Sequence, residues 1–256
     1  MASRNLKLTI EYEGSAYAGW QFQPEQKTVQ GTIVDAIEQV TQQRVNLVGA
    51  GRTDAGVHAL GQVANFRVDH QLETDRFANA INYYLPDDIR IHKSEQVDHD
   101  FHSTCDATFR QYRYLVAHDR SAIYRGLRWE CGLKLDLDDL NQVASEIVGE
   151  HNFASFCVTS SLKEDNRCRI ASSQWSRSGE LYIYEIRGNR FLHNMVRGLV
   201  GSMVNIVGKP ADKNPLNLTF ERFRDIISLS VDSAIDPERV GFTAPAHGLY
   251  MVAVGY

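Results

Sequence analysis

A glycine-rich stretch at residues 49–66, GAGRTDAGVHALGQVANF, holds the residues of this chain that are best suited to do chemistry. It places Arg52 and Asp54 two positions apart, between apolar runs that are typical of strands. Glycine tolerates backbone conformations that other residues avoid, so the stretch predicts a tight loop of special shape. A loop that holds a carboxylate beside a guanidinium is a candidate site. On these residues alone, a glycine-rich turn with a surface ion pair is an equally open interpretation.

Three residues are candidates for a role in the chemistry. A carboxylate beside an arginine suits a nucleophile better than a general acid, which favours that role for Asp54. Tyr112 lies on a tyrosine-rich strand, where ordinary cross-strand packing is the alternative to a functional role. Arg197 lies on an otherwise apolar helix, where the alternative is a side chain that simply faces solvent.

The elements that must position these residues begin with a strand–helix–strand–strand–helix–strand order in the first part of the chain. Thr28 and Thr74 are the expected N-caps of the two helices. Hydrophobic periodicity predicts strands at 6–12, 45–48, 62–68 and 89–97, and helices from Thr28 to about 43 and from Thr74 to about 85. This order is that of the split-βαβ, ferredoxin-like arrangement, which many RNA-binding modules share.

The rest of the chain repeats the strand and helix theme. Strands are expected at 107–118, 170–177, 181–187 and 249–254, with a hairpin turn at Ser178-Gly179. Helices are expected at 136–148, 191–207 and 219–229, and Gly198 and Gly201 suggest that the second of them packs closely against a neighbour. The predicted fold class is α+β, with two ferredoxin-like (RRM-like) lobes at 1–102 and 103–256. We expect the lobes to share an extended, mainly antiparallel sheet with helices packed on it, and to form the active-site cleft between them.

Composition and missing motifs exclude several classes of protein. The chain of 256 residues has no apolar run long enough to cross a membrane, and its N-terminus does not resemble a secretory signal. Its four cysteines show no CxxC pairing, so reduced thiols and a cytoplasmic location are expected. There is no P-loop, dinucleotide-binding loop, zinc deaminase pattern or convincing metal-ligand spacing. We therefore predict no cofactor and no metal.

Charge is distributed unevenly along the chain. A net charge of −5 argues against a protein that coats nucleic acid by bulk electrostatics. Within residues 110–128, however, five arginines face a single acid, and a second group lies between 163 and 197; the five are Arg110, Arg113, Arg120, Arg125 and Arg128. Arginine suits bidentate phosphate contacts, so a local RNA-binding surface and a merely solvated face both remain open.

Taken together, several segments resemble the TruA family of tRNA pseudouridine synthases. The similar segments run nearly end to end and are YEGSAYAGWQFQP, TVQGTI, GAGRTDAGVHALGQVANF, QYRYLVAH, FLHNMVRGLVGSM and APAHGLYMVAVGY. The run GRTDAGVHA followed by GQV is long and specific. The regions 158–169 and 208–242 resemble the family only loosely.

The resemblance implies an isomerase (class EC 5.4.99) that converts uridine to pseudouridine at positions 38 to 40 of the tRNA anticodon stem-loop, without a cofactor. It implies that Asp54 is the nucleophile on a flipped-out base, that Arg197 pairs with this aspartate, and that Tyr112 packs on the uracil and can move a proton. It further implies that Arg52 enters the space that the flipped nucleotide vacates and that Leu249 lines the uracil pocket. A homodimer is implied as well.

Two other classes of function account for part of the sequence. A non-catalytic RNA-binding protein built on paired ferredoxin-like lobes explains the arginine clusters, but not the position of Asp54 inside the glycine loop. A small-molecule hydrolase with Asp54 as nucleophile leaves the arginine clusters unexplained.

Overall fold

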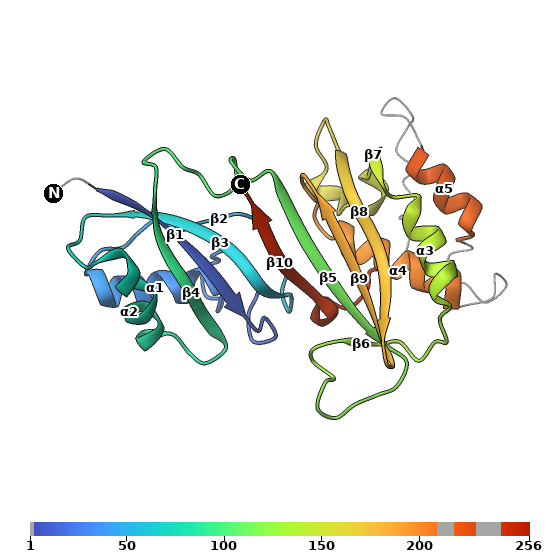
Figure 1. The fold of residues 1–256 in the computed structure, drawn as a ribbon, viewed down its shortest axis with the longest axis horizontal. Coiled ribbons are helices and arrows are strands. Elements are labelled where there is room, and N and C mark those ends of the chain that lie inside the picture. Colours follow the sequence, from blue (N-terminus) through green and yellow to red (C-terminus); the bar gives the residue numbers. More distant parts are fainter. Residues whose placement is uncertain (1–2, 209–217, 229–241) are drawn as a thin grey trace. The chain divides into compact units, whose positions relative to one another are not determined.

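The protein is an α+β protein whose contacts divide it into two compact units (Figure 1). The computed structural model describes residues 3–208, 218–228 and 242–256. The first unit contains Met1–Thr108 together with Tyr250–Tyr256, and the second contains Phe109–Leu249. The end of the chain thus belongs to the first unit, whereas the sequence-based division placed all of 103–256 in the second. The reason is backbone pairing: Tyr250 and Met251 lie opposite His58 and Ala59 on a strand of the first unit.

The first unit is built on a sheet with the strand order β4-β1-β3, and β3 carries further strands. β1 (Arg4–Tyr12) pairs antiparallel with both β3 (His58–Val68) and β4 (Ile89–Val97). The short β2 (Val48–Gly49) pairs antiparallel with β3, and β10 (Leu249–Gly255) pairs parallel with it. Alternate residues of β1 are fully buried, as the apolar alternation predicted; they are Leu6, Leu8, Ile10 and Tyr12.

Two helices that contact each other complete the first unit. α1 (Val29–Thr41) begins at the predicted cap, because the Thr28 side chain accepts a hydrogen bond from the Gly31 backbone N–H. The prediction that Thr74 caps the second helix was wrong: Thr74 lies in the short 3₁₀ turn η1 (Thr74–Arg76), and α2 (Phe77–Tyr84) follows it. Ser94 on β4 takes over the capping role, since its hydroxyl accepts from the Ala78 N–H at 3.1 Å and donates to the Thr74 carbonyl at 2.6 Å.

The second unit has a sheet with the order β5-β9-β8-β7. β5 (Phe109–Ala117), β9 (Leu181–Gly188), β8 (Arg167–Ser178) and β7 (Gly149–Asn152) pair antiparallel with their neighbours, and β6 (Trp129–Glu130) pairs parallel with β5. The predicted hairpin turn between β8 and β9 is confirmed, with Gly179 at a φ of 58°. The short strands β6 and β7 were not predicted.

Helices α3 (Leu137–Ser145), α4 (Met195–Gly208) and α5 (Phe220–Ser228) belong to this unit. The buried Trp175 ring donates its N–H to the Met203 sulfur of α4 and lies against Tyr184, which ties that helix to the sheet. The predicted helix start at 191 was too early, because Asn194 has a φ of 65° and α4 begins after it. Close packing of Gly201 is confirmed, since a Cβ there would lie 1.6 Å from the Phe242 carbonyl oxygen.

None of the helices within the described residues is both long and apolar enough to cross a membrane.

Candidate active site

Asp54 opens a tight turn that leads directly into β3. Its carbonyl accepts a hydrogen bond from the Val57 N–H at 3.1 Å, and Gly56 inside the turn has a φ of 79°, a conformation that favours glycine. The side chain of Asp54 is half-buried, that of Thr53 is buried and that of Arg52 is exposed. The glycine-rich stretch thus forms the specially shaped loop that its composition predicted, with the carboxylate at the start of the turn.

The end of β1 and the loop that follows it, residues 12–20, contact this turn. The Trp20 N–H donates to the Thr53 carbonyl at 3.0 Å, and the Tyr12 hydroxyl shares a hydrogen bond of 2.7 Å with the Thr53 hydroxyl. A Cβ at Gly14 would lie 2.0 Å from the Val57 carbonyl oxygen, and a Cβ at Gly19 would lie 2.7 Å from that of Thr53. Both glycines therefore allow the two loops to lie in direct backbone contact.

The other end of the stretch is fixed just as firmly. The Ala50 N–H donates to the Val63 carbonyl at 2.7 Å, and the Gln62 side chain donates to the Gly51 carbonyl at 2.8 Å. The buried indole of Trp20 lies against Gly49, where a Cβ would come within 2.5 Å of its ring nitrogen. Both flanks of Asp54 are thus held by buried groups, which gives its backbone a defined place before any substrate binds.

His58 is a supporting residue that the sequence reasoning missed. It is 1% exposed, its Nδ1 accepts the Gly14 N–H at 3.0 Å, and its ring stacks on Tyr250 at 4.7 Å between centroids. Because Nδ1 is the acceptor, the neutral tautomer with the proton on Nε2 fits this site. Burial, with a smaller contribution from the nearby Glu13 charge, raises the pKa of Tyr250 to about 12, so its hydroxyl stays protonated at neutral pH. The only signal in the sequence was the position of His58 within the motif GVHA.

Arg197, the third residue of α4, is held in place by hydrogen bonds from its side chain. Its Nε donates to the Ala244 carbonyl at 2.8 Å and one terminal nitrogen donates to the Asn194 side-chain oxygen at 3.0 Å. The Ala244 N–H in turn donates to the Arg197 carbonyl at 3.1 Å. The half-buried side chain is therefore anchored, and the interpretation of Arg197 as a merely solvent-facing residue is excluded.

Tyr114 lies within the electrostatic reach of Arg197. Its hydroxyl donates to the Pro245 carbonyl at 2.6 Å, and Gly248 packs against its ring so closely that a Cβ would come within 2.5 Å. Burial raises the pKa of Tyr114 well above its usual range, and the Arg197 cation opposes part of that rise. Leu249, which directly follows Gly248, is 6% exposed.

Tyr112 occupies the same face of β5 as Tyr114, two residues away. It is 8% exposed, lies opposite Ile186 in the register with β9, and meets the Phe191 ring edge-to-face at 5.1 Å. Phe191 and Asn194 belong to one segment, residues 189–194, which joins β9 to α4. This segment therefore contacts both Tyr112 and Arg197.

The predicted site residues fall into two groups. The first unit holds Arg52 and Asp54 on the glycine-rich loop, and the second holds Tyr112, Arg197 and Leu249. Among the residues that the structure describes, no group of three or more histidine, cysteine, aspartate or glutamate side chains is arranged to hold a metal ion.

The chain matches the family model described as tRNA pseudouridine synthase over residues 8–106 and 143–256. It is 41% identical over 257 residues to tRNA pseudouridine synthase A of Acetivibrio thermocellus, covering 99% of this chain and all of that relative. It is 41% identical to the enzyme of that name from Brachyspira hyodysenteriae over 96% of both chains. It is 37% identical to the one from Caldicellulosiruptor bescii, over 99% of this chain and all of the relative.

The family match includes the glycine-rich loop with Asp54, the helix with Arg197 and the last strand with Leu249. Tyr112 and the rest of β5 lie between the two matched ranges. The relatives extend the similarity across the whole chain. The protein belongs to the tRNA pseudouridine synthase family.

Proposed function

We propose that the protein converts uridine to pseudouridine at positions 38–40 of the tRNA anticodon stem-loop, with Asp54 as the nucleophile. The observation that carries this proposal is the near end-to-end similarity to relatives named tRNA pseudouridine synthase A, which spans the loop of Asp54. The backbone of Asp54 is fixed by the hydrogen bonds of its turn, and its side chain is half-buried. Both features support its role as nucleophile, because a nucleophile acts best from a fixed position.

The proposed reaction moves one bond and keeps the composition of the RNA. The Asp54 carboxylate attacks C6 of the uracil or C1′ of the ribose, and the N1–C1′ bond breaks. The uracil then turns and rejoins through a C5–C1′ bond, while the C5 proton passes to solvent and N1 gains a proton. The bond between Asp54 and the substrate breaks in the course of these steps, which restores the free carboxylate. A route that begins with loss of the C2′ proton remains an alternative. No electrons are exchanged with a partner, so we propose no cofactor.

The other site residues take supporting roles in this proposal. Arg197 pairs with the Asp54 carboxylate, Tyr112 packs on the uracil and is a candidate for moving the C5 proton, and Leu249 lines the uracil pocket. Extruding a base from a stem costs a few kcal/mol. The exposed guanidinium of Arg52 can offset part of this cost by stacking where the base was.

We also propose that the first unit is a ferredoxin-like module, as expected for an RNA-binding fold. Its strands β2, β3, β1 and β4 follow one another antiparallel, with α1 between β1 and β2 and α2 between β3 and β4 in the chain. By similarity to the family we further propose the same for the second unit, a homodimer as the working form and the cytoplasm as its location. All four cysteines are free thiols, which agrees with a reducing compartment.

The loop between β5 and β6 is our candidate for gripping the tRNA backbone. It exposes Arg120 and Arg125, and the Arg128 guanidinium lies 5.1 Å from the centre of the half-exposed Tyr124 ring. Ser121 gives the loop its shape, because its hydroxyl accepts from two following N–H groups at 3.2 Å each. An arginine and aromatic surface of fixed shape suits phosphate contacts and base stacking.

Replacing Arg120 and Arg125 together by Ala should weaken tRNA binding without lowering turnover at saturating tRNA. Each lost phosphate contact should make the plot of log affinity against log salt concentration shallower by roughly 1. Titrations at several salt concentrations measure this slope. Arg44→Ala is the matched control, because Arg44 is exposed in the first unit and pairs with Asp35 and Glu38. An unchanged slope in the double variant would remove this loop from the RNA surface.

The function itself is tested by release of tritium from C5 of uridine. Unmodified tRNA labelled at C5 is incubated with the protein, and we expect label in the water, because pseudouridine formation replaces the C5–H bond by a C5–C1′ bond. Tight tRNA binding with no release from any tRNA would favour the RNA-binding module over the enzyme. Absence of both binding and release would leave the small-molecule hydrolase.

A further inference from the structure

Residues 189–194, the β9–α4 connection, contact two residues of the candidate site. Phe191 meets the Tyr112 ring edge-to-face at 5.1 Å, and the Asn194 side-chain oxygen accepts from Arg197 at 3.0 Å. The segment has no regular secondary structure of its own. Its conformation is therefore set by the groups around it, and it lies against the Tyr112 ring and the Arg197 guanidinium.

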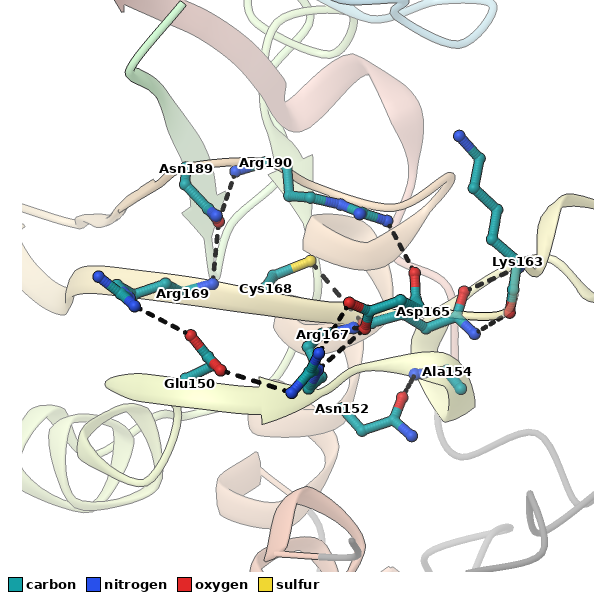
Figure 2. A network of polar contacts seen from close by, with 11 residues as sticks. Glu150, Asn152, Ala154, Lys163, Asp165, Arg167, Cys168, Arg169, Asn189 and Arg190 are labelled. Carbon is teal, nitrogen blue, oxygen red and sulfur yellow. Dashed lines mark hydrogen bonds and ion pairs between the residues drawn. The ribbon is translucent and has the colours of Figure 1, made fainter. Parts of the chain in front are cut away.

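Asn189 fixes the start of the connection to the neighbouring strand β8. Its side-chain oxygen accepts from the Arg169 N–H at 2.9 Å and from the Arg190 N–H at 2.8 Å, while its own N–H donates to the Arg169 carbonyl at 3.0 Å. Figure 2 shows the Asn189 side chain placed between these two backbone nitrogens. One amide oxygen thus sets both the distance of the connection from β8 and the direction in which Arg190 leaves.

The middle and the end of the connection are fastened to the irregular region 158–166. Arg190 donates to the Asp165 carbonyl at 3.2 Å (Figure 2). The His193 carbonyl accepts from the Val158 N–H at 3.2 Å, and its Nδ1 lies 2.9 Å from the Ser161 hydroxyl. The region 158–166 therefore touches the connection on both sides of Phe191.

The region 158–166 is held by hydrogen bonds and ion pairs that involve strands β7 and β8. Asp165 accepts from the backbone N–H of Arg167 at 2.9 Å and from two nitrogens of its guanidinium at 3.0 Å each (Figure 2). These bonds, with the Arg167 charge, lower the pKa of Asp165 to about 2. Asp165 is therefore ionised throughout the neutral range and keeps its bonds to Arg167. Glu150 on β7 joins Arg167 and Arg169 at 3.9 and 3.2 Å. All of these side chains are exposed, and exposed ion pairs add little to folding stability.

We propose that this polar network, centred on Asn189, is a positioning device for Tyr112 and Arg197. It holds the connection so that Phe191 orients the Tyr112 ring and Asn194 orients the Arg197 guanidinium. Asn189 touches neither of these residues and acts through the connection, as a positioning residue. The inference rests on the proposed function, because it assumes that Tyr112 and Arg197 act on the uridine.

Asn189→Leu removes the accepting oxygen at nearly constant size, whereas Asn189→Asp keeps it. We expect the Leu variant to lower kcat for tritium release roughly 10- to 100-fold, with KM for tRNA changed less than about twofold, because small displacements of reacting groups are costly. The Asp variant should recover most of the lost kcat. Asn152→Leu is the matched control: Asn152 accepts from the Ala154 N–H at 3.1 Å in the same network, and within the described residues its side chain has no hydrogen bond to the connection (Figure 2).

The outcomes separate this inference from the function on which it rests. If wild type releases tritium and Asn189→Leu keeps its kcat, or loses no more than Asn152→Leu, the positioning role is wrong and the proposed function stands. A rise in KM alone would make Asn189 an RNA contact and would also overturn the inference. Amide hydrogen exchange gives a readout that needs no turnover: the N–H groups of residues 191–198 should exchange faster in Asn189→Leu and not in Asn189→Asp. A wild type that releases no tritium would overturn the function and the inference together.

Discussion

Asn in place of Asp54 should abolish isomerisation while leaving the fold and tRNA binding intact. The amide is not a competent nucleophile, so we expect kcat to fall by roughly 10⁴-fold or more. The bond in the turn from the Val57 N–H uses the backbone carbonyl of residue 54 and is retained in the variant. Tritium release under single-turnover conditions measures the loss, and thermal unfolding checks the fold.

Asp75→Asn is a matched control for this experiment, because Asp75 is an exposed aspartate of the first unit outside the glycine-rich loop. Its release rate should equal that of wild type. Sustained release by Asp54→Asn at more than a few per cent of the wild-type rate would rule out Asp54 as the nucleophile.

Replacing Arg197 by Ala should separate turnover from binding. The change removes the hydrogen bonds to Ala244 and Asn194, together with the cation that we propose pairs with the Asp54 carboxylate. We expect kcat to fall by roughly 10²- to 10³-fold, with the Kd for tRNA within about threefold of wild type. Arg197→Lys should restore little, because one ammonium group cannot reproduce the planar fork that reaches both oxygens at once.

Arg224→Ala on the exposed face of α5 controls for the loss of a positive charge in the same unit and should change neither quantity. If Arg197→Ala lost affinity by as large a factor as turnover, Arg197 would be a phosphate contact, and its proposed role beside the aspartate would be wrong.

Elements whose signals are local could be predicted from the sequence. The Thr28 cap, the bounds of β4 and the β8–β9 turn depend on neighbouring residues only, and all three are confirmed. Elements that depend on distant parts of the chain were misjudged. Ser94 on β4, and not Thr74, caps α2, and the last strand joins the first unit through its pairing with β3.

The same distinction holds for the candidate site. The glycines of the loop predicted a tight turn of special shape, and Gly56 takes the positive φ that this turn needs. The turn also lies in direct backbone contact with a second loop. This second loop, with Gly14 and Gly19, lies far enough away in the chain that no spacing rule could identify it. His58 was missed for a similar reason, since its hydrogen bond to Gly14 and its stacking on Tyr250 depend on contacts made only in the folded chain.

The central claim, isomerisation of uridine at positions 38–40 by this chain, is tested most directly with two matched anticodon stem-loop RNAs. One carries C5-tritiated uridine at positions 38–40 and the other carries cytidine there, with labelled uridine placed elsewhere in the stem. We expect stoichiometric tritium release and pseudouridine at 38–40 from the first RNA, and no release from the second. Equal release from both RNAs, or release from neither by a correctly folded protein that binds them, would contradict it.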